Sequence, residues 1–179
     1  MVHTDACSDV FLNPGEFHFG GGGARVSTIL GSCVSITAWH GGLRVGGMCH
    51  FLLPARAARG SGGADGLYAD EAMRIFLQAM SRHCTRPSDY QVKLFGGANM
   101  FPTITPVPGR DIGTRNIEAA RALIGAAGMQ VIAEHVGGVG YRRIVMDLGN
   151  GDVWVKQKNE VFVPEFDTLP LPDFGQGRR

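Results

Sequence analysis

Two runs of strand-forming residues flank the pair Gly41-Gly42 in the first third of the chain. In the first run, residues 33–40, neighbouring side chains point alternately to the two faces of an extended strand. A Gly-Gly pair between two such runs predicts a tight β-hairpin, because both glycines can adopt positive φ. No other stretch restricts the fold as strongly as 27–54.

The hairpin also predicts which side chains lie across from one another. With Gly41 and Gly42 as the loop, Cys33 lies directly opposite His50, with Cβ atoms roughly 4.5–5.5 Å apart. A four-residue loop centred on the same glycines gives the same pair, whereas a β-bulge shifts the register by one residue. A thiol beside an imidazole is the arrangement of a cysteine nucleophile and its acid–base partner. The alternative is that the two residues simply pack together.

Other residues near this pair are consistent with Cys33 acting as a nucleophile. An imidazolium at His50 would stabilise a Cys33 thiolate and then serve as a general acid. Gly31 and Ser32 leave the backbone open, so N–H groups at 31–33 can point at a developing oxyanion. Gly47, which precedes His50, gives a substrate room to approach.

A hydroxyl upstream of the hairpin is a third candidate. Ser27 lies six residues before Cys33, so it shares the same face if the strand is regular. It would then orient His50 or the bound amide. Thr28 lies an odd number of residues before Cys33, so in a regular strand its side chain is on the other face.

Length and charge narrow the class of protein. A chain of 179 residues is long enough for one domain with its own hydrophobic core. The formal net charge of +1 gives no electrostatic case for nucleic acid or an anionic membrane. No apolar run approaches the roughly 20 residues that span a bilayer, and the first residues lack the pattern of a signal peptide. We therefore expect a cytoplasmic protein without membrane insertion.

Cysteines, histidines and glycines give no sign of a metal or cofactor. The four cysteines form no C-x-x-C pair, and we expect all four to be reduced, with Cys49 and Cys84 buried as small apolar residues. The six histidines lack metal-ligand spacing. The run Gly20–Gly23 lacks the features of a P-loop or dinucleotide motif and is expected to be a loop or hairpin tip.

The remaining pattern predicts an α+β fold with mixed sheets, because hairpins stand beside two helices. The expected elements are a strand at 16–19, a helix from 69 or 70 to 84, a strand at 90–95, a helix at 115–127 capped by Thr114, a strand at 130–136, and a hairpin of 143–148 with 152–156. The first helix should bury a stripe of Ala69, Met73, Phe76, Leu77, Met80 and Cys84. Residues 55–66 are expected to form a loop. Residues 1–163 are expected to form a single domain, and 164–179 a Pro-rich tail.

Several motifs, in order along the chain, resemble the signature of the CheD family of chemoreceptor glutamine deamidases. They are Leu30-Gly31-Ser32-Cys33-Val34, Gly46-Gly47-Met48-Cys49-His50-Phe51-Leu52-Leu53-Pro54, Tyr68-Ala69-Asp70, Gly96-Gly97-Ala98-Asn99-Met100-Phe101, Ile112-Gly113-Thr114-Arg115-Asn116, and Gly137-Gly138 with Arg142. The resemblance covers roughly residues 10–158.

The resemblance implies a cysteine hydrolase that converts receptor glutamine side chains to glutamate, with a layered fold like the catalytic domain of cytotoxic necrotizing factor. It assigns the nucleophile to Cys33 and the general acid/base to His50. The family's third catalytic position is a threonine six residues before the cysteine. Ser27 stands there and is the first candidate, with Thr28 the second. Methylesterase activity would use the same groups.

The resemblance also implies partners. These are the cytoplasmic domains of chemoreceptors and a CheC-type chemotaxis phosphatase. Residues 96–101 are either a contact rim for one of these partners or a loop that anchors the core. Nothing in the sequence requires more than a monomer. Two rival readings stay open: a non-catalytic adaptor that binds receptors or the phosphatase, and another thiol hydrolase such as a transglutaminase or esterase.

Overall fold

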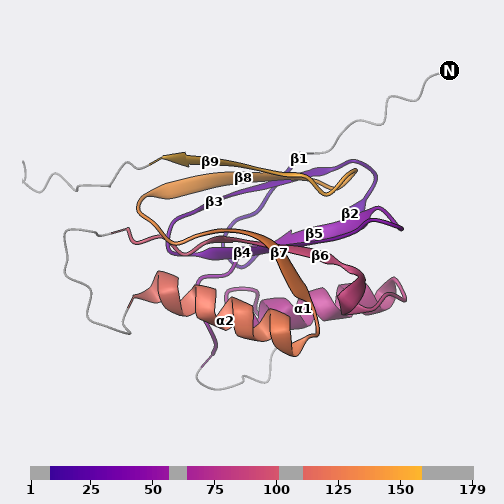
Figure 1. The fold of residues 1–179 in the computed structure, drawn as a ribbon, viewed down its shortest axis with the longest axis horizontal. Helices are drawn as coiled ribbons and strands as arrows, with labels where there is room; N and C mark the ends of the chain where they lie inside the picture. The colour runs from indigo at the N-terminus through magenta and orange to yellow at the C-terminus, as the bar shows by residue number, and fades with distance from the viewer. Residues whose placement is uncertain (1–8, 57–63, 101–110, 159–179) are drawn as a thin grey trace, which may run out of the picture.

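Two β-sheets and a pair of helices form three layers (Figure 1). The computed structural model describes residues 9–56, 64–100 and 111–158. The outer sheet has the order β1-β3-β8-β9 and the central sheet the order β2-β5-β4-β6-β7. Both sheets are mixed, because β1 pairs with β3 and β6 with β7 in parallel while the other pairs are antiparallel. This confirms the predicted α+β architecture.

The elements follow the chain in the order shown by the colours of Figure 1. They are β1 (Asp9–Phe11), β2 (Phe17–Gly21), β3 (Arg25–Leu30), β4 (Val34–His40), β5 (Val45–Cys49), α1 (Ala69–Arg82), a short 3-10 helix (Pro87–Asp89), β6 (Gln91–Gly96), α2 (Ile112–Ala126), β7 (Gln130–Val136), β8 (Tyr141–Asp147) and β9 (Val153–Lys158).

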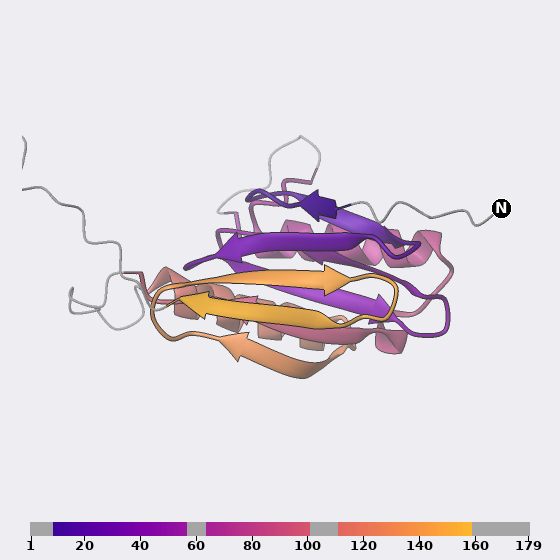
Figure 2. The ribbon, with the colours of Figure 1, turned by 90° about the horizontal axis from the view of Figure 1, so that it is seen from above.

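Buried apolar side chains fill the two spaces between the three layers. One core cluster lies between the central sheet and the two helices, and includes Val34, Ile36, Phe51 and Phe76. A second cluster joins the two sheets, and includes Val26, Leu30, Met48 and Phe95. In Figure 2, seen from above, the outer sheet lies across the central one. The central sheet is therefore covered on both faces.

The predicted helices form with adjusted ends. The α1 stripe is buried at Ala69, Met73, Phe76 and Met80. The prediction that Cys84 is buried is wrong, since it is exposed just beyond the helix with a φ of 56°. The free thiol of Cys49 is buried, as predicted.

The cap predicted for the second helix is also wrong. Asp111 is the N-cap of α2, and its carboxylate accepts hydrogen bonds from the backbone N–H and the hydroxyl of Thr114. A carboxylate cap suits the positive end of the helix dipole. The helix therefore begins at Ile112, three residues earlier than predicted.

The central hairpin forms, but its register differs from the prediction by two residues. His40 pairs with Val45 and Thr37 with Met48, so the loop is the four-residue segment 41–44. Arg44 closes this loop with a φ of 52°, and its N–H donates to the carbonyl of His40. A shift of two keeps every side chain on its predicted face.

The register places Leu52 opposite Cys33, because Val34 pairs with Phe51. His50 is then the diagonal neighbour of Cys33 on the same face. Diagonal neighbours typically lie about 7–8 Å apart, which longer side chains can bridge. The predicted direct Cys33–His50 pairing is therefore corrected to a diagonal one.

Strand β7 has the predicted bounds, and β8 and β9 form the second hairpin across 149–151. Gly20 and Gly21 extend β2 rather than forming a loop, and β1 was not predicted. Residues 57–63 of the predicted 55–66 loop, and the tail at 164–179, lie outside the described residues, as does Cys7.

Candidate active site

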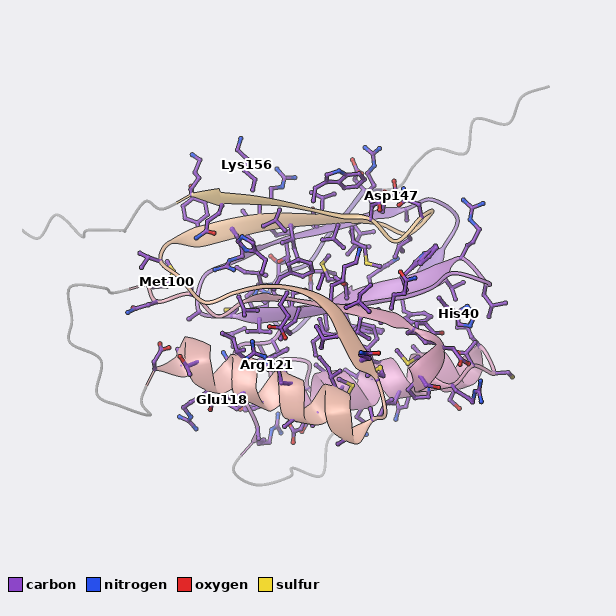
Figure 3. The ribbon with its side chains drawn as sticks, in the orientation of Figure 1. His40, Met100, Glu118, Arg121, Asp147 and Lys156 are labelled. Atoms are coloured by element: carbon purple, nitrogen blue, oxygen red, sulfur yellow. The ribbon has the colours of Figure 1, made fainter. Side chains whose placement is uncertain are left out.

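Gly31, Ser32 and Cys33, three of the residues predicted to carry chemistry, lie in the turn between β3 and β4. Gly31, the first residue of this turn, lies against the side chain of Met100, whose Sδ would come within 2.6 Å of a Cβ placed on that glycine. Figure 3 labels Met100 at one end of the molecule and His40 at the opposite end. The candidate site is therefore at the Met100 end.

Thr28 and His50 meet in the layer between the sheets. The Thr28 Oγ1 lies 2.8 Å from the His50 Nδ1, and both residues are almost fully buried, at 0% and 2% exposure. Thr28 comes from β3 of the outer sheet, where its neighbours Val26 and Leu30 are buried on the same face. His50 follows β5, and its N–H and carbonyl are held by hydrogen bonds to Glu16 and Gly15.

A third group determines which atoms of this pair carry protons. The Thr28 hydroxyl donates to the carbonyl of Leu12 at 2.8 Å. A carbonyl only accepts, so the single hydroxyl proton is committed to Leu12. The Thr28 oxygen must then accept from His50, which places the proton of the neutral imidazole on Nδ1. Nε2 is left with a free lone pair.

That lone pair is not used elsewhere. The Nε2 of His50 is buried and has no hydrogen-bond partner among the described residues. Burial lowers the pKa of His50, although the Leu12 backbone and the charge of Glu16 act in the opposite direction. The neutral ring with an available Nε2 is the form required of a general base.

Cys33 stands between β3 and β4 and packs against the cluster that joins the two sheets. It is a free cysteine of intermediate exposure. Burial raises the pKa of its thiol, and its own backbone N–H offsets part of that rise. In the resting site the thiol and the imidazole are therefore both favoured in their neutral forms.

The turn that carries Cys33 is fixed through three successive carbonyl groups. The carbonyl of Gly31 accepts from the N–H of Ala98, and that of Cys33 from the N–H of Gly97, both at 2.8 Å. The carbonyl of Ser32 accepts from the side-chain amide of Asn116 at 3.1 Å. In trans peptides the N–H points away from the preceding carbonyl, so the N–H groups of Ser32 and Cys33 face away from these partners.

The N–H groups of Ser32 and Cys33 belong to the segment for which oxyanion donors are predicted, and that role stays a prediction. Among the described residues, neither the Ser32 N–H nor the Cys33 N–H donates to a backbone carbonyl. Gly31 and Ser32 therefore lie where the sequence placed them, in the turn beside the thiol.

Ser27 and Gly47 lie elsewhere. The side chain of Ser27 is on the outer face of β3, opposite to Thr28 in the alternation of buried and partly exposed residues. A Cβ on Gly47 would come within 2.2 Å of the His18 carbonyl, so this glycine permits close approach of β2 rather than of a substrate. The structure joins Thr28, not Ser27, to His50.

Two contributors were not found from the sequence. The Leu12 carbonyl is a backbone group, and no residue type signals it. Asn116 lies in the motif 112–116 of the resemblance. It is 83 residues from Cys33 in the chain, and no sequence pattern links the two.

The described parts of the chain contain no group of three or more His, Cys, Asp and Glu side chains that could hold a metal ion. Within the same residues, no helix is long and apolar enough to cross a membrane.

The fold and the site together define an α+β protein with a cysteine thiol, a buried histidine and oriented backbone donors. A model of the CheD family, described as CheD chemotactic sensory transduction, matches residues 52–157. The chain belongs to the CheD family.

Relatives match a longer part of the chain than the family model does. The chain is 50% identical over 149 residues to a protein of Dechloromonas aromatica named "Probable chemoreceptor glutamine deamidase CheD 3", covering 82% of this chain and 86% of that one. It is 45% identical over 152 residues to "Probable chemoreceptor glutamine deamidase CheD" of Pseudomonas fluorescens, covering 84% and 85%.

Similarity to solved structures is weaker. Bacillus licheniformis hypothetical protein YfiH has a TM-score of 0.40 over 66% of this chain and 49% of that one, and YlmD from Geobacillus stearothermophilus 0.43 over 73% and 60%, each at 15% identity. Values this low carry no argument, and the predicted likeness to cytotoxic necrotizing factor stays a prediction.

Proposed function

We propose that this protein is a chemoreceptor glutamine deamidase in which Cys33 is the nucleophile, His50 the general acid/base and Thr28 the residue that orients His50. The observation that carries the proposal is the Leu12–Thr28–His50 chain of hydrogen bonds, which leaves Nε2 as a free base. The names of the relatives supply the substrate class.

The first half of the reaction forms a thioester. The Nε2 of His50 takes the proton from the Cys33 thiol as sulfur attacks the carboxamide carbon of a glutamine. The N–H groups of Ser32 and Cys33 donate to the oxyanion that develops. The C–N bond then breaks, and the nitrogen leaves as ammonia after receiving the proton held on Nε2.

The second half regenerates the enzyme. Neutral His50 takes a proton from water, and the hydroxide attacks the thioester carbonyl. The C–S bond breaks, the sulfur recovers the proton from Nε2, and a glutamate side chain is released. Thr28 keeps the ring in one orientation through both halves, because its oxygen accepts from Nδ1. An ester of a methylated glutamate would react through the same groups.

The test is incubation of the purified protein with cytoplasmic fragments of chemoreceptors, followed by peptide mass spectrometry. Wild-type protein should convert particular glutamines to glutamates, and Cys33→Ala should convert none. Cys33→Ala performing as well as wild type would refute the thiol mechanism. Added primary amine should leave no adduct if water is the acceptor, which separates deamidation from transglutamination.

The main alternative is a non-catalytic adaptor that binds receptors or a CheC-type phosphatase. A free nucleophile beside a free base favours the enzyme, because binding alone requires neither. We further propose a cytoplasmic monomer whose partners are chemoreceptor cytoplasmic domains and a CheC-type phosphatase. Pull-down with each partner, using wild type and Cys33→Ala, distinguishes binding from turnover.

A further inference from the structure

A buried amide links α2 to the two chain segments that flank the central hairpin. Asn116 is fully buried in α2, and its Nδ2 donates to the carbonyl of Ser32 at 3.1 Å and to that of Leu52 at 2.8 Å. Both acceptors are carbonyl oxygens, so the atom that faces them must be the NH₂ group of the amide. Two donors on one side chain therefore join the segment before β4 to the segment after β5.

The two carbonyls flank the nucleophile. Ser32 directly precedes Cys33, and Leu52 is the residue opposite Cys33 in the hairpin register. The amide thus holds the strands together at the level of the thiol. Strand β4 begins only at Val34, so ladder hydrogen bonds do not hold the Ser32 peptide.

The hydrogen bond to Ser32 sets the direction of one particular donor. The carbonyl of Ser32 and the N–H of Cys33 belong to the same peptide group, and in a trans peptide they point in opposite directions. Because Asn116 draws the carbonyl toward the helix layer, the Cys33 N–H is turned toward the layer between the sheets, where the thiol lies.

Packing alone does not account for an asparagine here. Its Oδ1 is buried without a hydrogen-bond partner among the described residues. An apolar side chain of similar size would remove this unpaired oxygen, but it would leave the carbonyls of Ser32 and Leu52 without the donor that Asn116 gives them. The amide is therefore suited to directing the Ser32–Cys33 peptide, because its NH₂ group holds the Ser32 carbonyl in place.

We propose that Asn116 is a positioning residue for the oxyanion site: it fixes the Ser32–Cys33 peptide so that the Cys33 N–H meets the oxyanion formed on attack by the thiol. This inference rests on the proposed function for its natural reaction. The positioning role itself applies to any reaction in which Cys33 attacks a carbonyl group, whatever the natural substrate is.

Two reagents that react with the same thiol separate this role from general packing. Acylation of Cys33 by p-nitrophenyl acetate passes through an oxyanion, whereas alkylation by iodoacetamide does not. Asn116→Leu should slow acylation about 10- to 100-fold, as expected for a misdirected oxyanion donor, and leave alkylation within about 2-fold. Asn116→Ala, which introduces no extra bulk, should show the same selectivity and serves if the leucine variant folds poorly.

Asp111→Ala is the matched control. It removes the N-cap of the same helix and lowers stability. The Asp111 carboxylate bonds within the first turn of α2, to Thr114 and to the Gly113 backbone, and not to the Cys33 turn. Its acylation and alkylation rates should both stay near wild type below its melting temperature. Acylation and alkylation that fall together in the Asn116 variants, no change in either, or the same selective loss in Asp111→Ala would overturn the inference.

The natural reaction is measured separately. Wild-type protein that is acylated normally but deamidates no receptor fragment would refute the proposed function and leave the reagent comparison intact. If the wild-type protein deamidates receptor fragments and Asn116→Leu does so with the same kcat, only the positioning role is refuted. The expected result is a lower kcat with a KM close to wild type.

Discussion

The hydroxyl of Thr28 and the imidazole of His50 are 2.8 Å apart, although they belong to different sheets. Strand β3 of the outer sheet supplies the hydroxyl, and the chain just after β5 of the central sheet supplies the ring. The orientation of His50 therefore depends on how the two sheets pack. The Leu12 carbonyl, which lies directly after β1, completes this contact from the edge of the outer sheet.

Removing the Thr28 hydroxyl should impair catalysis strongly. In Thr28→Val the Nδ1 of His50 loses its acceptor, so the ring is no longer held in one orientation. We expect kcat to fall about 100-fold, and the free energy of unfolding to drop by about 1–3 kcal/mol because two buried polar groups lose their partner. Steady-state deamidation and urea unfolding measure the two effects.

Ser27→Ala and Thr28→Ser are the controls for that prediction. Ser27 lies on the opposite face of β3, so its alanine variant should keep kcat within about 3-fold of wild type. Thr28→Ser retains the hydroxyl and should recover most of the activity. A larger loss from Ser27→Ala than from Thr28→Val would assign the third role to Ser27 instead.

The pH dependence of Cys33 reactivity should show a neutral resting pair. Burial raises the pKa of Cys33 and lowers that of His50. An imidazolium–thiolate pair is therefore not favoured, and the rate of alkylation by iodoacetamide should keep rising with pH through 9.0, the ordinary value for the thiol. A rate that is already maximal near pH 6 would show a preformed ion pair and contradict the prediction.

Deamidation should follow a different profile. The attack requires neutral His50 and an un-ionised thiol, so kcat/KM should rise through a pKa below the ordinary 6.5 of histidine and stay level to about pH 9. The His50→Gln variant should lose the acidic limb together with most of the activity. A kcat/KM that falls steeply between pH 7 and 8 would contradict the assignment of His50 as the base.

The hairpin illustrates what the sequence can and cannot specify. The alternation placed Cys33 and His50 on one face, and that result survives because the register error is two residues. The error arose because the loop is not centred on its glycines. Arg44 occupies the left-handed region, and its guanidinium donates to the Gly149 carbonyl of the distant β8–β9 hairpin, a tertiary contact with no local signal.

The sequence favours Ser27 over Thr28 as the hydroxyl that meets His50, whereas the structure brings Thr28 to the ring. Counting from Cys33 back to Ser27 assumes one regular strand. In the structure β3 ends at Leu30 and β4 begins at Val34, and the turn between them carries the chain from one sheet to the other. Across such a turn, an even or odd number of residues no longer tells on which face of the sheet a side chain lies. The choice between Ser27 and Thr28 therefore depends on the tertiary structure.

Cys49 should make the protein less stable in alkali. Burial raises the pKa of this thiol to about 12 in the folded protein. Because the unfolded thiol ionises near 9.0 and the folded one does not, the folded state binds more protons above that value. The contribution of the Cys49 thiol to the free energy of unfolding is fully present below pH 9. It should diminish by about 1 kcal/mol between pH 8 and 10. Guanidinium unfolding across this range, compared between wild type and Cys49→Ala, isolates the effect.

The comparison of slopes is the decisive result for Cys49. Cys49→Ala should be less stable overall because it leaves a cavity, but its stability should decline less steeply above pH 9. Identical slopes in the two proteins would show that the thiol ionises equally in the folded and unfolded states.

Gly96 should tolerate no side chain, because it brings β6 against the nucleophile turn. Its φ is 107°, and a Cβ would lie 2.2 Å from the carbonyl oxygen of Cys33, a backbone atom that cannot move aside. Gly96→Ala should therefore cost about 2–4 kcal/mol of stability and lower kcat, because the Cys33 peptide is displaced. Gly125→Ala, at an open position in α2, should instead stabilise the protein by about 0.5–1 kcal/mol. Thermal unfolding of both variants measures the contrast, and a Gly96→Ala protein as stable as wild type would mean that the strand does not approach Cys33 this closely.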